Sequence, residues 1–255
     1  MLVAQVQATN VRVSAWQTTR EDGPFVCPAC SEPVVLHKGT SRTHHFAHKA
    51  KSDCKHGVGE TEIHRRAKMG LFLALSKYPN LQCGIEVPLQ GVRSDVWFQS
   101  ISTKRTYAIE VQVSQLTMAE IIERTKRYAS QGVYVLWLFE WKSELRLKQY
   151  SPSLKERWAH ALNFGWVYYW SEGETVIPVK FDKVLLYRSE SSWYDSDGSE
   201  QGAGGNWYTS KRYRKPLIGD LLTIARDFRG VERKAWKGGD IEIPACRILT
   251  AKSTL

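Results

Sequence analysis

The fold is decided by two nearby stretches, Arg93-Ser-Asp95-Val and Ala108-Ile-Glu110-Val-Gln112-Val-Ser114. Residues 92–99 and 106–113 alternate apolar and polar side chains and are joined by a polar segment, which predicts an antiparallel hairpin. On the second strand Glu110, Gln112 and Ser114 share one face, while the intervening aliphatic residues face the other. Asp95 and Glu110 would meet across this hairpin and form an oxygen-rich site suited to Mg²⁺ or Mn²⁺.

The elements around the hairpin predict an α/β fold. Apolar residues at three- and four-residue spacing predict a helix over residues 60–77, and a short strand follows over residues 83–88. A capping box formed by Thr117 and Glu120 opens a second helix that runs to about Ser130. The apolar run 133–139 predicts a buried strand. The predicted order is helix, three strands, helix, strand.

The first helix carries a second group of candidate residues. Glu60, His64 and Lys68 stand four residues apart and therefore line one helix face. Glu60 could add a carboxylate to the metal site, while His64 and Lys68 could reach a phosphate group. The alternative is a solvent-exposed helix with Glu–Lys pairs.

Residues 21–58 are rich in Cys and His and poor in large apolar side chains. Cys27-Pro-Ala-Cys30 has the spacing of a zinc knuckle, and Cys54 is a natural third ligand. His48 is the preferred fourth ligand, with His45 as the alternative, because the two would point to opposite faces of a strand. Four protein ligands make this zinc structural rather than catalytic. A redox Cys-x-x-Cys pair or free cysteines are the lesser alternatives, and the remaining histidines in this segment are expected at the surface or on nucleic acid: His37, His44 and His56.

Composition limits the possible partners and the compartment. The chain has 255 residues, with 36 Lys and Arg against 26 Asp and Glu, a net charge of +10 that makes a polyanionic partner plausible. Apolar runs are too short to span a membrane, so no membrane association is expected. Five cysteines without a signal-like N-terminus favour a reducing, cytoplasmic compartment over a disulfide scaffold.

The last third of the chain changes character twice. Residues 190–206 are rich in Ser, Gly and acidic side chains and are expected to form a flexible loop. Residues 206–239 are basic and interleaved with aromatic side chains, a combination that suits phosphate pairing and base stacking. A basic solvated helix is the alternative. The candidate nucleic-acid contacts are Lys211, Arg212, Arg214 and Lys215, together with Arg124 on the second core helix.

The ordered set of motifs over residues 25–170 resembles the competence protein CoiA family. It runs from Cys-Pro-x-Cys and His-Phe-x-His through Glu-Thr-x-x-His-x-x-x-Lys and Arg-x-Asp-Val to Ala-Ile-Glu-Val-Gln-x-Ser. The resemblance implies an N-terminal zinc-binding module (1–58) and a restriction-endonuclease-like PD-(D/E)XK nuclease core of order αβββαβ (59–145). We expect the remaining residues (146–255) to form a C-terminal α+β extension. It also implies that Asp95 and Glu110 bind the metal, with Glu60 assisting.

Gln112 departs from that family pattern, because it occupies the position of the motif lysine. Glutamine carries no charge, although it can orient a water or a phosphate oxygen. Lys68 or Arg124 could replace the missing charge. The prediction is a Mg²⁺- or Mn²⁺-dependent nuclease with DNA as the favoured substrate, acting in competence and recombination. The alternatives are a non-catalytic DNA-binding mediator that recruits a recombination partner, and an antiphage effector with the same chemistry.

Overall fold

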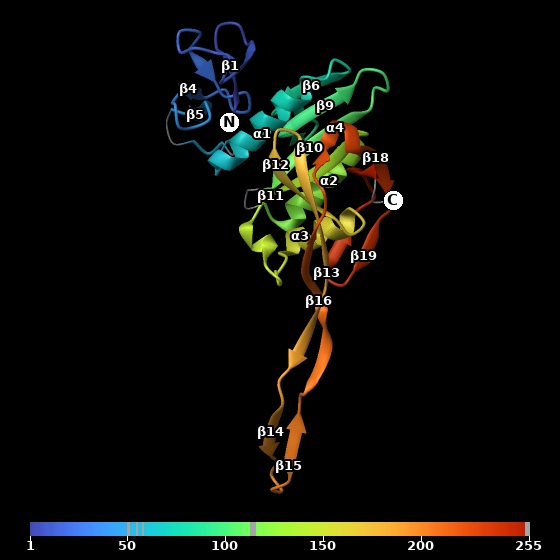
Figure 1. The fold of residues 1–255 in the computed structure, drawn as a ribbon. Coiled ribbons are helices and arrows are strands. Elements are labelled where there is room, and N and C mark those ends of the chain that lie inside the picture. The colour runs from blue at the N-terminus through green and yellow to red at the C-terminus, as the bar shows by residue number, and fades with distance from the viewer. Residues whose placement is uncertain (50–51, 55, 58, 113–115, 253–255) are drawn as a thin grey trace.

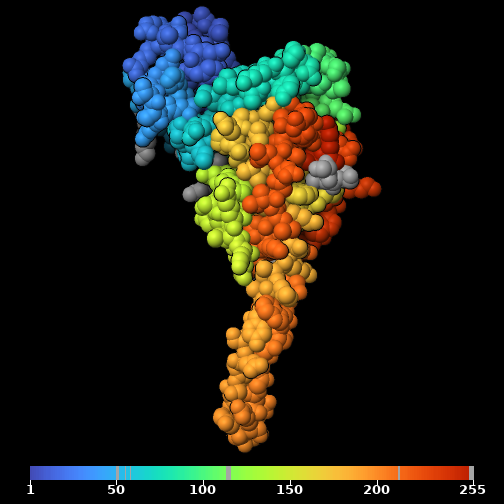
Figure 2. Space-filling view, viewed as in Figure 1, coloured from blue at the N-terminus to red at the C-terminus, as the bar shows by residue number. Residues whose placement is uncertain are grey.

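The computed structural model describes residues 1–49, 52–54, 56–57, 59–112 and 116–252, without the side chain of Arg212. Figure 1 shows a small N-terminal sheet next to a larger α/β body, from which a long two-stranded arm projects. Figure 2 shows that this arm extends away from the body as a narrow stalk. The predicted residues Ser114 and Val113 lie outside the described part of the chain.

The N-terminal sheet has five strands in the order β2-β1-β3-β4-β5. Its core is small, with the rings of Phe25 and Phe46 in edge contact at 5.2 Å between centroids. A core of this size contributes little stability by itself, so a structural metal would add to the stability of this sheet. The strands are β1 (Val3–Val6), β2 (Arg12–Ser14), β3 (Phe25–Val26), β4 (Pro33–His37) and β5 (His45–His48).

The main sheet runs in the order β16-β13-β12-β11-β10-β9-β6, in which β13 spans Thr175–Arg188 and β16 spans Asn206–Ile218. Strand β21 (Cys246–Ala251) pairs in parallel with β11 and antiparallel with β18 (Phe228–Arg233), and β17 (Leu222–Thr223) pairs with β13. Residues of the C-terminal third therefore belong to the same sheet as the core hairpin. The central strands are β6 (Leu81–Ile85), β9 (Val96–Ser100), β10 (Thr106–Gln112), β11 (Tyr134–Glu140) and β12 (Val167–Glu172).

The predicted mixed α/β arrangement is confirmed, with one local difference at Asp95. The predicted first strand of the hairpin is split into β8 (Val92–Arg93) and β9, and β8 forms a small hairpin with β7 (Pro88–Leu89). Asp95 lies in the break, where its carbonyl accepts from the backbone N–H of Glu86. The break arises because the chain changes partner here, from β7 to β6 and β10.

Helices cover both faces of the main sheet. Helix α1 (Glu62–Leu75) packs on one face, and α2 (Met118–Ser130) and α3 (Leu154–Leu162) pack on the other. Thr61 caps α1 rather than lying inside it, and the predicted Thr117–Glu120 capping box of α2 is present. Since both faces are covered, β10 is buried from Ala108 to Gln112. Ile109 and Val111 pack on the α1 side and Ala108 packs on the α2 side, so the predicted alternation along this strand is present.

The predicted flexible loop at residues 190–206 is instead part of the arm. Strand β13 (Thr175–Arg188) pairs with β16 (Asn206–Ile218), and β14 (Ser191–Tyr194) pairs with β15 (Glu200–Ala203) at the tip. Backbone pairing explains the difference, because a two-stranded ribbon satisfies its ladder hydrogen bonds without a hydrophobic core. The basic residues on β16 are therefore on a strand and not on a solvated helix.

The remaining elements complete the larger body (Figure 1). They are the short helices η1 (Ser143–Arg146) and α4 (Ile224–Asp227) and the hairpin of β19 (Trp236–Gly238) and β20 (Ile241–Ile243). Within the described ranges, none of the helices is long and apolar enough to cross a membrane.

Candidate active site and metal centre

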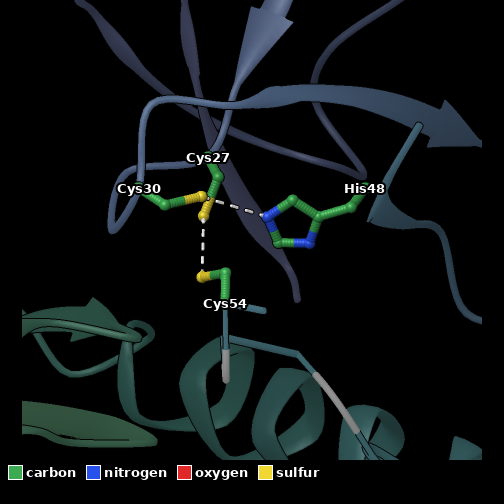
Figure 3. A group of neighbouring side chains, drawn as sticks. All are labelled: Cys27, Cys30, His48 and Cys54. Atoms are coloured by element: carbon green, nitrogen blue, oxygen red, sulfur yellow. Dashed lines mark hydrogen bonds between the residues drawn. The ribbon is translucent and has the colours of Figure 1, made fainter. Parts of the chain in front are cut away.

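Three cysteines and one histidine converge at the edge of the N-terminal sheet (Figure 3). One ligand atom from each of Cys27, Cys30, His48 and Cys54 lies within 4.8 Å of all the others. His48 Nε2 is 3.3 Å from Cys30 Sγ, and Cys27 Sγ is 4.0 Å from Cys54 Sγ. This Cys₃His cluster could hold a structural metal such as zinc.

The knuckle at Cys27 is held by backbone hydrogen bonds. The Ser31 N–H donates to the Cys27 carbonyl, and the Cys27 N–H donates to the Glu32 carbonyl. The N–H groups of Ala29 and His56 approach the sulfurs of Cys27 and Cys54 at 3.4 and 3.5 Å. Such N–H···S contacts stabilise thiolates, the form that binds metal.

His45 is not part of this cluster. Its Nδ1 lies 2.9 Å from the Thr43 carbonyl oxygen, and its ring stacks on that of His37 at 5.1 Å. The sequence prediction that His48 is the fourth member, with His45 on the other face of the strand, agrees with this geometry.

His56 corrects the expectation of a surface histidine, because it is only 4% exposed. Its Nδ1 lies 3.4 Å from Cys27 Sγ and its Nε2 lies 3.4 Å from Glu86 Oε2. His56 therefore connects the Cys₃His cluster to a second polar site. His37 is exposed and His44 is half-buried, in agreement with the prediction for them.

That second site is a cleft of about 300 Å³ between α1, the β9–β10 hairpin and α2. It brings together every residue predicted to act in catalysis, and adds Arg124 and Glu86. Its charged and polar lining residues are His56, Glu60, His64, Lys68, Glu86, Arg93, Asp95, Glu110, Gln112, Glu120 and Arg124.

Asp95 lies at the hairpin edge of the cleft. The register places Val96 opposite Ile109, so Asp95 and Glu110 are the next residues on the two chain segments. The Asp95 carboxylate lies 3.0 Å from His64 Nε2 and accepts from the Val111 N–H at 2.9 Å. Burial by itself raises the pKa of Asp95, but His64 and the nearby Lys68 hold it well below its usual range. Asp95 is therefore ionised at neutral pH.

Glu110 faces the opposite helix. It accepts hydrogen bonds from Arg124 at 2.6 Å and from the Tyr128 hydroxyl. Burial raises the pKa of Glu110, as does the negative charge of Asp95, while Arg124 opposes the rise. The negative charges of Asp95 and Glu110 thus repel each other, but each carboxylate has its own ion-pair partner, His64 for Asp95 and Arg124 for Glu110.

A buried ammonium lies at the centre of the α1 side. Lys68 Nζ lies 2.6 Å from Glu86 Oε1, pairs with Glu60, and lies 3.9 Å from Asp95 Oδ1. Burial lowers the pKa of Lys68, but the three carboxylates together raise it above its ordinary value. Lys68 stays protonated and cannot serve as a base.

Sequence reasoning missed Glu86, which is only 2% exposed. Its carboxylate accepts from the backbone N–H groups of Leu2 and Val3 at 2.9 and 3.2 Å, and its φ of 51° is unusual for a residue other than glycine. The one available signal was an acidic residue within the predicted strand 83–88, nine positions before Asp95.

The acidic cleft differs from the Cys₃His cluster in how closely its possible ligand atoms approach one another and in how many of them already have partners. Among the described His, Cys, Asp and Glu side chains, only the Cys₃His set brings three or more ligand atoms within 4.8 Å. Glu60 is occupied by Lys68 and by the Met1 α-amino group at 2.7 Å. Asp95 and Glu110 are likewise paired, with His64 and Arg124, and they are neighbours across the hairpin.

The predicted nucleic-acid contacts fall in two places. Arg124 lies in the cleft, whereas Lys211, Arg214 and Lys215 lie on β16 of the arm and do not line the cleft. The side chain of Arg212 is outside the described part of the structure.

Two family models match this chain. Competence protein CoiA, N-terminal domain, matches residues 8–57, and competence protein CoiA, nuclease-like domain, matches residues 60–165. The first match contains the Cys₃His cluster, and the second contains the charged and polar residues of the acidic cleft other than His56. Neither the curated proteins nor the solved structures give a match.

Proposed function

Because this chain belongs to the competence protein CoiA family and carries its nuclease-like domain, we propose that it is a metal-dependent nuclease. The substrate is the phosphodiester backbone of nucleic acid, with DNA favoured, and the metal is Mg²⁺ or Mn²⁺. One observation carries the proposal. Asp95 and Glu110 lie opposite each other, one position beyond the last paired residues of the hairpin, and they line the same cleft as the cations Lys68 and Arg124.

The order of elements supports a PD-(D/E)XK type of core. Helix α1 precedes β6, β9 and β10. Helix α2 then connects β10 to β11, and these two strands pair in parallel. This is the order αβββαβ, apart from the small β7–β8 hairpin. Asp95 lies directly before β9, and Glu110 lies within β10.

The donor set fits a hard divalent cation, since Asp95 and Glu110 offer carboxylate oxygens. Bound there, Mg²⁺ or Mn²⁺ would polarise the scissile phosphate and lower the pKa of an attacking water. The protonated Lys68 supplies the positive charge that Gln112 lacks, and Gln112 can orient a water or phosphate oxygen by hydrogen bonding. Arg124 is placed to contact a phosphate at the mouth of the cleft.

A cleavage assay tests the proposal. Wild-type protein is incubated with labelled single- and double-stranded DNA and with RNA, in Mg²⁺, Mn²⁺ and Ca²⁺. We expect Mg²⁺- or Mn²⁺-dependent cleavage that falls at least ~100-fold in Asp95→Asn and Glu110→Gln. Glu123→Gln is the matched control, because Glu123 is an exposed acid on α2 that does not line the cleft. Undiminished cleavage by the Asp95 and Glu110 variants would disprove the proposal.

The second candidate is a DNA-binding mediator that keeps the nuclease fold as a scaffold. The pairing of Asp95 with His64 and of Glu110 with Arg124 favours it, because each acid already has a partner. The mediator predicts salt-sensitive DNA binding without turnover in any divalent metal. Action in the cytoplasm on DNA entering recombination is common to both candidates, whereas an antiphage effector would use the nuclease chemistry. Host toxicity that Asp95→Ala abolishes would favour the defence role.

A further inference from the structure

A second hollow, of about 550 Å³, lies where the arm leaves the body. It is formed by α3, the roots of β13 and β16, and the β19–β20 hairpin, which lie together in Figure 1. Its volume is within the range of about 300–1,000 Å³ that is usual for ligand sites. The residues that line it include Arg157, His160, Phe181, Lys211, Tyr213, Arg214 and Trp236.

Aromatic rings form the walls of this hollow. Phe181 is buried at its floor, whereas Tyr213 is 52% exposed and Trp236 is 46% exposed. The His160 ring lies 5.9 Å from that of Phe181 and 6.1 Å from that of Tyr213. Exposed ring faces around a recess are suited to stacking with a planar aromatic ligand.

The charged residues of this hollow are cationic. Lys211 and Arg214 line it together with Arg157, which is paired with Asp240 at 2.9 Å. None of its described lining residues is an Asp or Glu. Aromatic faces combined with net positive charge fit a base and its phosphate.

A groove next to the acidic cleft shares one chain segment with the hollow. Gln112 lines both the cleft and this groove, and Ser153 and Lys155 also line the groove. Ser151 and Arg157, on either side of those residues in sequence, line the hollow. The segment at the start of α3 therefore contributes residues to both the groove and the hollow.

We infer that this hollow binds an unstacked nucleotide of a single strand whose neighbouring phosphates run toward the acidic cleft. The base stacks on Tyr213 and Trp236, and its phosphates pair with Lys211 and Arg214. This inference rests on nucleic acid as the substrate of the proposed function, and it specifies a single-stranded segment.

Binding without added divalent cation tests the inference separately from cleavage. The probes are a fluorescein-labelled oligodeoxythymidine of about 20 nucleotides and the same backbone with abasic sites. We expect Tyr213→Ala to weaken binding of the thymidine strand about 5- to 100-fold and to change binding of the abasic strand little. Tyr213→Phe should keep affinity within about twofold, and Lys211→Ala should weaken binding of both probes.

Trp193→Ala is the matched control, because Trp193 is 50% exposed but lies at the tip of the arm. An iodouridine strand should crosslink to peptides containing Tyr213 or Trp236. Equal loss for both probes in Tyr213→Ala, equal loss in Trp193→Ala, or crosslinks only elsewhere would overturn the inference, as would absence of strand binding by the wild type. Absence of cleavage with intact stacking-dependent binding would instead overturn the nuclease and leave this site standing.

Discussion

The ammonium of Lys68 lies 2.6 Å from the carboxylate of Glu86, and both side chains are buried. Glu86 also accepts from the backbone of Leu2 and Val3 and contacts His56. One carboxylate therefore joins the N-terminal sheet to the cleft. The arrangement of charges around Asp95 depends on contacts from both parts of the chain.

Removal of the Glu86 carboxylate should destabilise the whole protein. Glu86→Ala leaves the buried positive charge of Lys68 with one carboxylate partner fewer. Breaking a buried ion pair costs about 3–5 kcal/mol. We expect a fall in the free energy of unfolding near the lower end of that range, because Glu60 still pairs with Lys68. Urea unfolding followed by tryptophan fluorescence measures it. Glu123→Ala, on an exposed part of α2, should change stability by less than about 0.5 kcal/mol, and an equally small change for Glu86→Ala would contradict the reasoning.

Zinc should be present at about one equivalent and be lost in Cys27→Ser. Removal of the metal by a chelator should lower the melting temperature, because a structural metal contributes its binding energy to folding. Elemental analysis and thermal melting are the measurements. Cys83→Ser is the control, since Cys83 lies on β6 outside the cluster and should keep the metal. Equal metal content in both variants would argue against the Cys₃His site.

Glu156 should make the stability of the protein depend on pH in the acid range. Burial raises the pKa of Glu156, but hydrogen bonds from Ser153 and Tyr150 and the charge of Lys142 bring it below its ordinary value. A lowered pKa in the folded state stabilises the protein above the unfolded-state pKa, about 4.3, and this contribution is lost as the pH falls through the folded value.

Glu156→Gln should therefore lower stability at pH 7 by about 1–3 kcal/mol and flatten its decline below about pH 4.5. Glutamine keeps one acceptor oxygen for the capping box of α3, so the variant removes the charge while the cap is retained. Unfolding free energies at a series of pH values provide the test. Parallel pH profiles for wild type and variant would contradict the assignment.

The tip of the arm should be dispensable for folding. Arg188 pairs with Asn206, so replacing residues 189–205 by Asn-Gly would close the ribbon with a two-residue turn. Strands β14 and β15 are exposed throughout, so the melting temperature should change by no more than about 2 °C. Calorimetry measures the change, and small-angle scattering should show a shorter particle. A fall of more than about 5 °C would show that the tip packs elsewhere.

Local patterns allowed much of the core to be predicted. The Thr117–Glu120 capping box and the alternating hairpin depend on neighbours close in sequence, and both were confirmed. The pair Cys27 and Cys30 was likewise identified by its spacing. In each case the sequence contains both partners within a short window.

Long-range contacts could not be predicted in this way. The position of the Glu86 side chain depends on a hydrogen bond from the backbone N–H of Leu2, which is 84 residues away in the sequence. The position of His56 depends on contacts with two separate parts of the chain, at Cys27 and at Glu86. Residues 190–206 were expected to form a loop because of their Ser- and Gly-rich composition, whereas their pairing depends on the register of a ribbon that begins far from the tip.

Strand β21 has a consequence for how the chain acquires its structure during translation. It pairs with β11 through Val135 and Ile248, and its residues belong to the same core. Strand β12 covers the Leu138–Glu140 end of the same flank, but the ribosome makes β11 long before β21, so the Val135 end has no neighbouring strand while the intervening residues are synthesised. The nuclease-like region therefore keeps an open sheet edge until a late-made strand emerges, and a fragment that ends at residue 165 is expected to aggregate.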